Sequence, residues 1–305
     1  MTKKSNIDIN AKTIQLARIH KLPLIAALLA ILSGSLVLFG YTFDSDVLKS
    51  LLPFWAPMKA NAAVCFVLIG SAIVLSDYAP SLLTPNAARL CLYMGQSCAM
   101  LTGLIGLLSL AEYAFTVNFG IDELLFRDVI DNNVGSTNPV MRKLETAYPG
   151  RIKLEAALSF VLLAVATIHS TKNHWRIISA SFGLLVLSLS LASLSSYFSP
   201  QLGQFGWFGH GIMRMNAAVL FALLGAAEML ISWQRNILSW SFSKSMTLAF
   251  ILSLFLLVLI GFNSSRTQFW LQSNHYEIAR NEKIETELNS LLLKFRSSKN
   301  TKQHP

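Results

Sequence analysis

Seven long apolar runs constrain the fold of this chain more than any other feature. A helix needs about 20 mostly apolar residues to cross the roughly 30 Å hydrocarbon layer of a bilayer. Runs that meet or approach this length lie at 22–41, 60–77, 90–113, 154–170, 177–197, 215–233 and 245–263. Only 13% of the residues are charged, against about a quarter in soluble domains. The sequence therefore predicts an all-α membrane protein with about seven transmembrane helices.

Three of the predicted helices begin with related sequences. Aligned without gaps, NAAVCFVLIG from Asn61, EAALSFVLLA from Glu155 and NAAVLFALLG from Asn216 share an alanine pair, a phenylalanine and the aliphatic residues after it. The helix before each of them ends in a tyrosine and a phenylalanine: Tyr41 with Phe43, Tyr113 with Phe115, and Tyr197 with Phe198. This repeat predicts three helical hairpins plus one helix, with the three aligned polar positions at equivalent depths around a pseudo-threefold core.

Small and polar residues in the repeat have packing uses as well as functional ones. Alanine pairs let helix backbones approach closely in a bilayer, and Gly70 and Gly225 continue this small face. Asn61 and Asn216 suit a helix start, an interhelical hydrogen bond or contact with a ligand. The sequence leaves these alternatives open.

A basic residue stands near the start of the second helix of each predicted hairpin: Lys59, Arg151 and Arg214. Positive charge is unfavourable there because the helix macrodipole is positive at its N-terminus. Three explanations remain: an anion bound with the help of helix N–H groups, ion pairs with loop acids, or contact with lipid headgroups. The candidate loop acids are Asp44, Asp46, Asp122 and Glu123.

Other titratable residues give weaker signals. His169, His174 and His210 lack the helical spacing of a metal or haem site, so we expect no metal and no cofactor. Glu112 and Glu228 lie near the ends of predicted spans, where we expect exposure at the membrane interface or, alternatively, part of an ion or proton path.

The distribution of charge predicts the orientation of the chain. The formal charge of +9 is spread over loops and tails, without the basic stripe and interleaved aromatics of a nucleic-acid site. Residues 1–21 form a basic tail, which the positive-inside rule places in the cytoplasm. An odd number of spans then places the C-terminus in the periplasm. We expect a multi-pass protein of the bacterial inner (cytoplasmic) membrane.

Several stretches together resemble a known kind of receptor region. GIDELLFRD from Gly120, PGRIKLEAALSFVLL from Pro149 and MRMNAAVLFALLG from Met213 resemble the multi-pass membrane input region that precedes PAS, histidine kinase or diguanylate cyclase modules in bacterial sensors. The resemblance covers nearly all of residues 22–263. It implies a pattern in which Asn61 and Asn216 match, whereas Glu155 departs from it.

The C-terminal stretch carries a second resemblance. Residues 264–296 read as a polar, amphipathic helix outside the membrane, with Ile284, Leu288, Leu291 and Phe295 at heptad spacing. This stretch resembles the opening helix of a CHASE3-type extracellular sensor, of which the later helices are absent. Residues 297–305 read as a disordered tail.

These features predict a membrane-embedded signal-input module of a two-component or cyclic-di-GMP sensor that lacks its own output domain. We expect no enzymatic activity, since no kinase, cyclase or hydrolase motif is present. The expected partners are the lipid bilayer, a second copy or a separate sensor kinase bound through the C-terminal helix, and an anionic or lipid-like ligand. The candidate ligand-binding residues are Lys59, Asn61, Arg151, Glu155, Arg214 and Asn216. A transporter or channel subunit and a truncated remnant are the alternatives.

Overall fold

The computed structural model describes residues 21–51, 56–122, 125–126, 150–171, 175–198 and 213–235, together with Arg280 and Ile284. The chain divides into two compact units, Met1–Val258 and Leu259–Pro305. All helices named below belong to the first unit. In the second unit the two described residues are helical. The predicted span 245–263 lies outside the described residues, as does nearly all of the predicted extramembrane helix.

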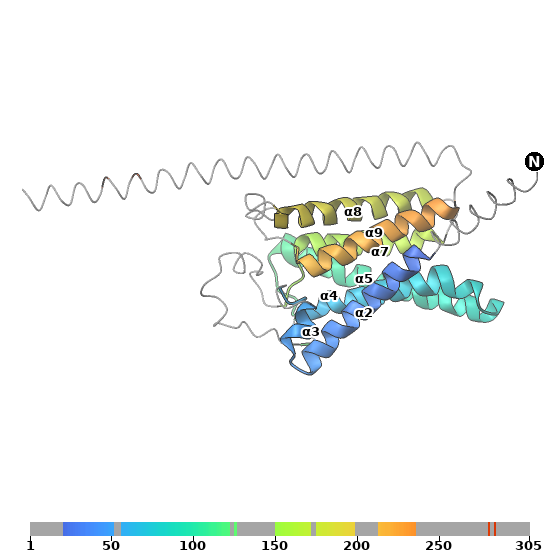
Figure 1. Cartoon of the computed structure of the whole chain (residues 1–305), viewed down its shortest axis with the longest axis horizontal. Helices are drawn as coiled ribbons and strands as arrows, with labels where there is room; N and C mark the ends of the chain where they lie inside the picture. Colours follow the sequence, from blue (N-terminus) through green and yellow to red (C-terminus); the bar gives the residue numbers. More distant parts are fainter. Residues whose placement is uncertain are drawn as a thin grey trace, which may run out of the picture. The chain divides into compact units, whose positions relative to one another are not determined.

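The described part of the first unit contains six long helices (Figure 1). They are α2 (Leu22–Thr42), α4 (Ala60–Ile73), α5 (Pro85–Phe115), α7 (Leu154–Ser170), α8 (Arg176–Phe198) and α9 (Met215–Arg235). Three shorter elements are α3 (Asp46–Ser50), the π-helix η1 (Val74–Tyr78) and the 3-10 helix η2 (Ala79–Ser81). Every regular element in the described ranges is a helix, which confirms the predicted all-α class.

Five helical segments are long and apolar enough to cross a membrane, which agrees with a membrane protein. They are Leu22–Thr42, Ala60–Ser81, Pro85–Phe115, Arg176–Ser195 and Met215–Gln234. The sixth helix, Leu154–Ser170, is apolar but has only 17 residues. The count of seven spans stays a prediction.

The six helices pack as a closed ring. The most extensive contacts join α2 with α4, α5 with α7, and α8 with α9, which we call the first, second and third pair. Smaller contacts join α4 to α5 and α7 to α8. The ring closes because α9, the last of these helices, packs on α2, the first.

Three phenylalanines fill the middle of the ring. Phe66, Phe160 and Phe221 come from α4, α7 and α9, and each is fully buried. Their ring centroids lie 4.9, 4.6 and 4.8 Å apart, so that every ring contacts the other two at a tilted or edge-on angle. These are the geometries that aromatic quadrupoles prefer. The aligned phenylalanines of the sequence repeat therefore meet at one point.

Within each pair the helices approach closely through a small residue. A Cβ placed on Gly70 would lie 2.7 Å from the Ala27 carbonyl oxygen, and one on Gly225 would lie 2.7 Å from the Gly183 oxygen. The second pair has Ala164 at this position, and there the facing helix supplies the small residue, Gly103. The expected small face is confirmed, and the second pair achieves the close approach with its glycine on the opposite helix.

Candidate functional site

One end of the ring carries the same hydrogen bond three times. A tyrosine near the end of the first helix of each pair donates its hydroxyl to a carbonyl oxygen just before the second helix. The bonds run from Tyr41 to Met58 (2.9 Å), from Tyr113 to Ile152 (3.0 Å) and from Tyr197 to Met213 (2.7 Å). We call this end of the ring, where α2, α5 and α8 finish and α4, α7 and α9 start, the tyrosine end.

The residue after each accepting carbonyl is basic and begins the next helix. Lys59, Lys153 and Arg214 accept the first helical bond from Ala63, Ala157 and Ala218, at 2.9–3.0 Å. The sequence prediction placed Arg151 in this set, and that assignment of equivalence is wrong. The gapless alignment makes Lys153 the equivalent of Lys59 and Arg214. Lys153 precedes Glu155 by the same two residues that separate Lys59 from Asn61 and Arg214 from Asn216.

The three basic helix starts line one small pocket. Each pair contributes the tyrosine-bonded residue, the basic residue and an alanine of the first turn, and Arg151 adds a fourth positive charge. The lining residues are Met58, Lys59, Ala62, Arg151, Ile152, Lys153, Ala156, Met213, Arg214 and Ala217. The cavity has a volume of about 20 Å³, room for one or two water molecules. Among the described residues, its lining includes four basic side chains and no acidic one.

Three of the four basic side chains at the pocket are buried. Arg151 is 2% exposed, Lys153 6% and Arg214 9%, whereas Lys59 is half-buried. Arg214 also donates a hydrogen bond to the Pro57 carbonyl oxygen of the first pair. Contact with lipid headgroups needs an exposed charge, so burial argues against that explanation for Lys153 and Arg214.

The three aligned polar residues hydrogen-bond from each pair to the next. Asn61 donates to the carbonyl oxygens of Ile121 (2.9 Å) and Asp122 (3.1 Å). The Glu155 carboxylate accepts from the Ser193 hydroxyl (2.8 Å) and the Met213 N–H (3.3 Å). Asn216 donates to the Ala56 carbonyl oxygen (3.3 Å). The bonds thus run from the first pair to the second, from the second to the third, and from the third back to the first.

The chemistry of these bonds explains why Glu155 departs from the repeat. Asn61 and Asn216 face backbone carbonyls, which require a donor. Glu155 faces an N–H and a hydroxyl, which require an acceptor. All three residues are buried, between 1 and 6% exposed. None of the three is among the pocket-lining residues, so of the six predicted site residues the pocket brings together Lys59, Arg151 and Arg214.

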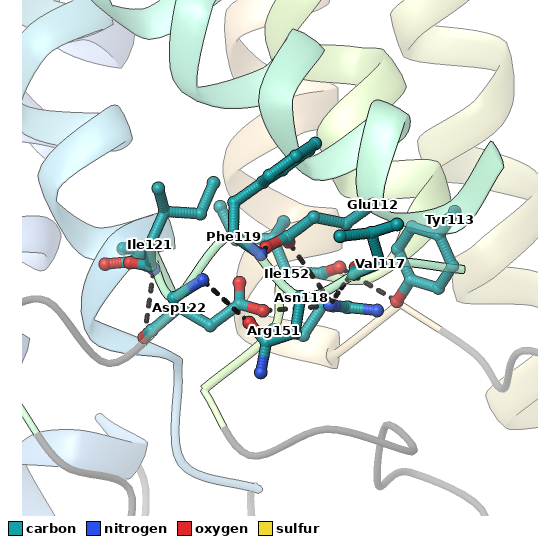
Figure 2. Close-up of polar contacts among 11 residues, drawn as sticks. Glu112, Tyr113, Val117, Asn118, Phe119, Ile121, Asp122, Arg151 and Ile152 are labelled. Carbon is teal, nitrogen blue, oxygen red and sulfur yellow. Dashed lines mark hydrogen bonds and ion pairs between the residues drawn. The ribbon is translucent and has the colours of Figure 1, made fainter. Parts of the chain in front are cut away.

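Arg151 lies in an ion cluster beside the pocket (Figure 2). Its Nε donates to Asp122 Oδ2 at 3.0 Å and lies 3.4 Å from Glu112 Oε2. A terminal nitrogen donates to the Val117 carbonyl oxygen at 3.1 Å, and the guanidinium carbon lies 5.5 Å from the centre of the Tyr113 ring. Of the three explanations for the basic residues, pairing with a loop acid is therefore realised by Arg151.

The two carboxylates of this cluster are buried in an environment that disfavours a second negative charge. Asp122 is 3% exposed, and burial raises its pKa to about 6, against the opposing effect of Arg151 and with a further increase from Glu112. Glu112 is fully buried and also accepts a hydrogen bond from the Phe119 N–H at 2.9 Å. The expectation that Glu112 lies exposed at the membrane interface is wrong, because Arg151 and a backbone N–H supply its partners.

Glu228 is also fully buried, at the opposite end of the ring. Its carboxylate accepts hydrogen bonds from Thr167 (2.5 Å) and Ser179 (3.2 Å), and Ser232 donates to Ser179 (3.1 Å). Interfacial exposure is therefore wrong for this residue too. The hydroxyl groups that bind the carboxylate in place of water belong to α7 and α8, which are far from Glu228 in sequence. The residues around Glu228 on α9 therefore do not predict them.

Comparison of the chain with protein-family models, with curated proteins and with solved structures found no match.

Proposed function

We propose that the membrane part is built from three copies of one helical hairpin, followed by a single helix. The support is the set of contacts that recur in all three pairs: the tyrosine bond, the basic helix start and the phenylalanine of the central contact. The cyclic order of the three aligned polar residues adds to it. The single helix corresponds to the predicted span 245–263.

We further propose that this protein is a membrane-embedded signal-input module and that the pocket at the tyrosine end binds an anion. One observation carries the proposal: three helix N-termini, each with a basic residue, converge on one cavity. Helix N-termini favour anions because their N–H groups and macrodipole are positive.

A binding module is favoured over an open pore by the packing below the pocket. The rings of Phe66, Phe160 and Phe221 contact one another at the centre of the ring of helices. The described side chains at this level therefore fill the axis. In our proposal the bound anion draws the three helix starts together, and the change reaches the predicted C-terminal helix through the predicted seventh span.

The output is assigned to a partner, either a second copy or a separate sensor kinase bound through the stretch 264–296. The proposed orientation places the N-terminus in the cytoplasm and the C-terminus in the periplasm of a bacterium. A C-terminal alkaline phosphatase fusion should then be active. An active cytoplasmic reporter at the same position would reverse the orientation.

Thermal unfolding of the purified protein in detergent tests the binding proposal. A panel of anions should raise the unfolding temperature of the wild type and have less effect on a Lys59→Ala, Arg214→Ala double variant. A matched control is the Lys21→Ala, Arg89→Ala variant, which removes the same charge from two exposed residues. If no anion distinguishes the wild type from the pocket variant, the proposal fails.

A transporter is the second candidate, and the buried Glu228 favours it. Carboxylates inside membrane proteins often mark ion or proton paths, and Glu228 has hydroxyl partners on two other helices. Reconstitution into liposomes separates the two functions. A transporter moves an anion or protons across the bilayer and loses this activity on Glu228→Gln, whereas an input module binds the anion without flux.

A further inference from the structure

The ion cluster beside the pocket contains two buried acids for one base (Figure 2). Glu112, Asp122 and Arg151 are each at most 3% exposed. Arg151 faces both carboxylates through one nitrogen, since its Nε lies 3.0 Å from Asp122 Oδ2 and 3.4 Å from Glu112 Oε2. One guanidinium balances one carboxylate. Ionisation of both acids would leave a second negative charge buried without a partner of its own, which is costly.

Two carboxylate oxygens of this cluster, Glu112 Oε2 and Asp122 Oδ1, are buried and accept no hydrogen bond from the described residues. The other oxygen of each group accepts one, from the Phe119 N–H and from Arg151 respectively. Buried polar atoms nearly always have a hydrogen-bond partner. A carboxyl that keeps its proton becomes a donor, so one proton between the two acids satisfies both oxygens.

The two carboxyls are close enough to share a proton. Burial raises the pKa of Asp122 to about 6, Arg151 opposes the increase, and the charge of Glu112 and a hydrogen bond with its carboxyl add to it. The pair therefore exchanges its proton in a pH range in which an isolated aspartate is already ionised.

Groups on the neighbouring elements act on this proton as well. Arg151 and the pocket residues Lys59 and Lys153 favour the ionised acids, because positive charge stabilises a carboxylate. The other polar side chains described at the cluster, Tyr113 and Asn61, donate their hydrogen bonds to backbone carbonyls. Burial and the repulsion between the two acids work in the opposite direction and keep one proton bound.

Asp122 also belongs to the contact between the first and second pairs. Its backbone carbonyl accepts a hydrogen bond from Asn61 of α4 at 3.1 Å, and the Ile121 carbonyl accepts another at 2.9 Å. Gly150 packs against the Asp122 carbonyl so closely that a Cβ on it would lie 2.4 Å from the oxygen. Repulsion that moves Asp122 therefore acts directly on the hydrogen bonds between the two pairs.

We propose that Glu112 and Asp122 form a proton-binding site, and that release of its proton loosens the contact between the first and second pairs. One exchangeable proton lies between Glu112 Oε2 and Asp122 Oδ1, and it is taken up from water and returned to water. With the proton bound, the remaining negative charge is balanced by Arg151. After its release the two adjacent carboxylates repel each other, and Asp122 moves away together with the carbonyl that Asn61 binds.

Infrared difference spectroscopy of the purified protein tests the shared proton, because a protonated carboxyl has a carbonyl stretching band that a carboxylate lacks. Between about pH 5 and about pH 8 the wild type should lose one such band. Glu112→Gln should lack the band throughout this range, because the one acid left pairs with Arg151 as a carboxylate. Glu228→Gln, which removes a buried acid outside the cluster, should retain the titrating band.

Hydrogen exchange, corrected for the pH dependence of the intrinsic rate, tests the effect on the contact between the pairs. The amide hydrogens of residues 117–122 should exchange on the order of tenfold faster once the proton is released. Asp122→Asn cannot acquire the second negative charge, so it should keep slow exchange over the same pH range. The first turn of α9 is the internal control, since Asn216 donates to the Ala56 carbonyl and not to a residue of the cluster.

Three results would overturn the proposal. Without a titrating band in the wild type, the cluster holds no exchangeable proton. A band that persists and titrates in Glu112→Gln would mean that Asp122 binds the proton alone. A band that titrates while exchange of residues 117–122 stays constant would mean that proton release does not loosen the contact. The first and third results need only the wild type, so they remain decisive if a variant fails to fold. All of these measurements are independent of anion binding in the pocket.

Discussion

The two ends of the helix ring differ in how closely the three pairs resemble one another. At the tyrosine end the three pairs make the same contacts, from the tyrosine bond to the basic helix start. At the opposite end the positions twelve residues after Asn61, Glu155 and Asn216 hold three different residues: Ile73, Thr167 and Glu228. The helices differ there too, because α4 continues as a π-helix whereas α7 ends at Ser170.

The difference follows from what each end must satisfy. The start of a helix has N–H groups without helical partners, and the segment before it has carbonyls that need donors. Three equivalent helix starts around one pocket meet the same need with a tyrosine hydroxyl and a basic residue in each pair. At the opposite end each pair meets its own polar requirements, and Glu228 receives hydroxyls from the second pair and from its own.

The central phenylalanines should show the largest and most uniform effect. Phe66→Ala, Phe160→Ala and Phe221→Ala should each lower the free energy of unfolding by about 3–5 kcal/mol, since each removes a fully buried ring and leaves a cavity. Unfolding in mixed detergent micelles measures this. A spread wider than about 2 kcal/mol among the three, which is the width of that range, would show that the threefold relation does not extend to the middle of the ring.

The opposite end should be sensitive to a polar change in one pair only. Thr167→Val preserves the shape and removes the hydroxyl bond to Glu228, so it should cost about 1.5 kcal/mol, near the upper range for interhelical hydrogen bonds in membranes. The same unfolding assay applies. In a Glu228→Ala background the valine substitution should cost much less, and an undiminished cost would mean that Thr167 acts through packing.

The tyrosine end should instead respond equally in all three pairs. Tyr41→Phe, Tyr113→Phe and Tyr197→Phe each remove one hydroxyl donor from a backbone carbonyl and should each cost about 1 kcal/mol. The tyrosine control is Tyr93→Phe, because Tyr93 is exposed and its loss should cost little. Unequal costs at the three positions would weaken the comparison between the ends.

Much of this organisation could be predicted from the sequence, and its limits have physical causes. The apolar runs predict the positions of the six described long helices, and the gapless repeat aligns Phe66, Phe160 and Phe221 with one another. A repeat shows which positions of its three copies are equivalent, but it does not show which copies touch. The contact of α9 with α2 and the cyclic hydrogen bonds are therefore visible only in three dimensions.

Charged residues are harder to interpret from sequence than apolar ones. Arg151 lies 39 residues from Glu112 and 29 from Asp122 in sequence, so no local spacing marks the cluster. Apolar periodicity reports burial directly, whereas a charge reads as exposed until its partner is known. For this reason the sequence favours interfacial positions for Glu112 and Glu228, although both are buried.

The ion cluster at the tyrosine end should make the stability of the protein depend on pH. The pKa of Asp122 is raised from 3.8 to about 6, so the folded protein holds a proton that the unfolded chain has released between these pH values. Stability from this residue is therefore present below about pH 4 and is lost as the pH rises to about 6. The unfolding temperature of the wild type should fall over this window relative to that of Asp122→Asn. Parallel curves would mean that Asp122 titrates normally.

Glu155 provides the smallest expected effect and the most direct test of the departure in the second pair. Glu155→Gln keeps an oxygen that accepts from Ser193 and Met213, so the free energy of unfolding should change by less than about 0.5 kcal/mol. Asn61→Asp is an equally isosteric change, yet it replaces a donor with a carboxylate that faces the carbonyl oxygens of Ile121 and Asp122. It should cost several times more, because a buried charge would then lack a donor. If both substitutions are equally mild, hydrogen-bond direction does not decide which residue occupies the aligned position, and Glu155 differs from the asparagines for another reason.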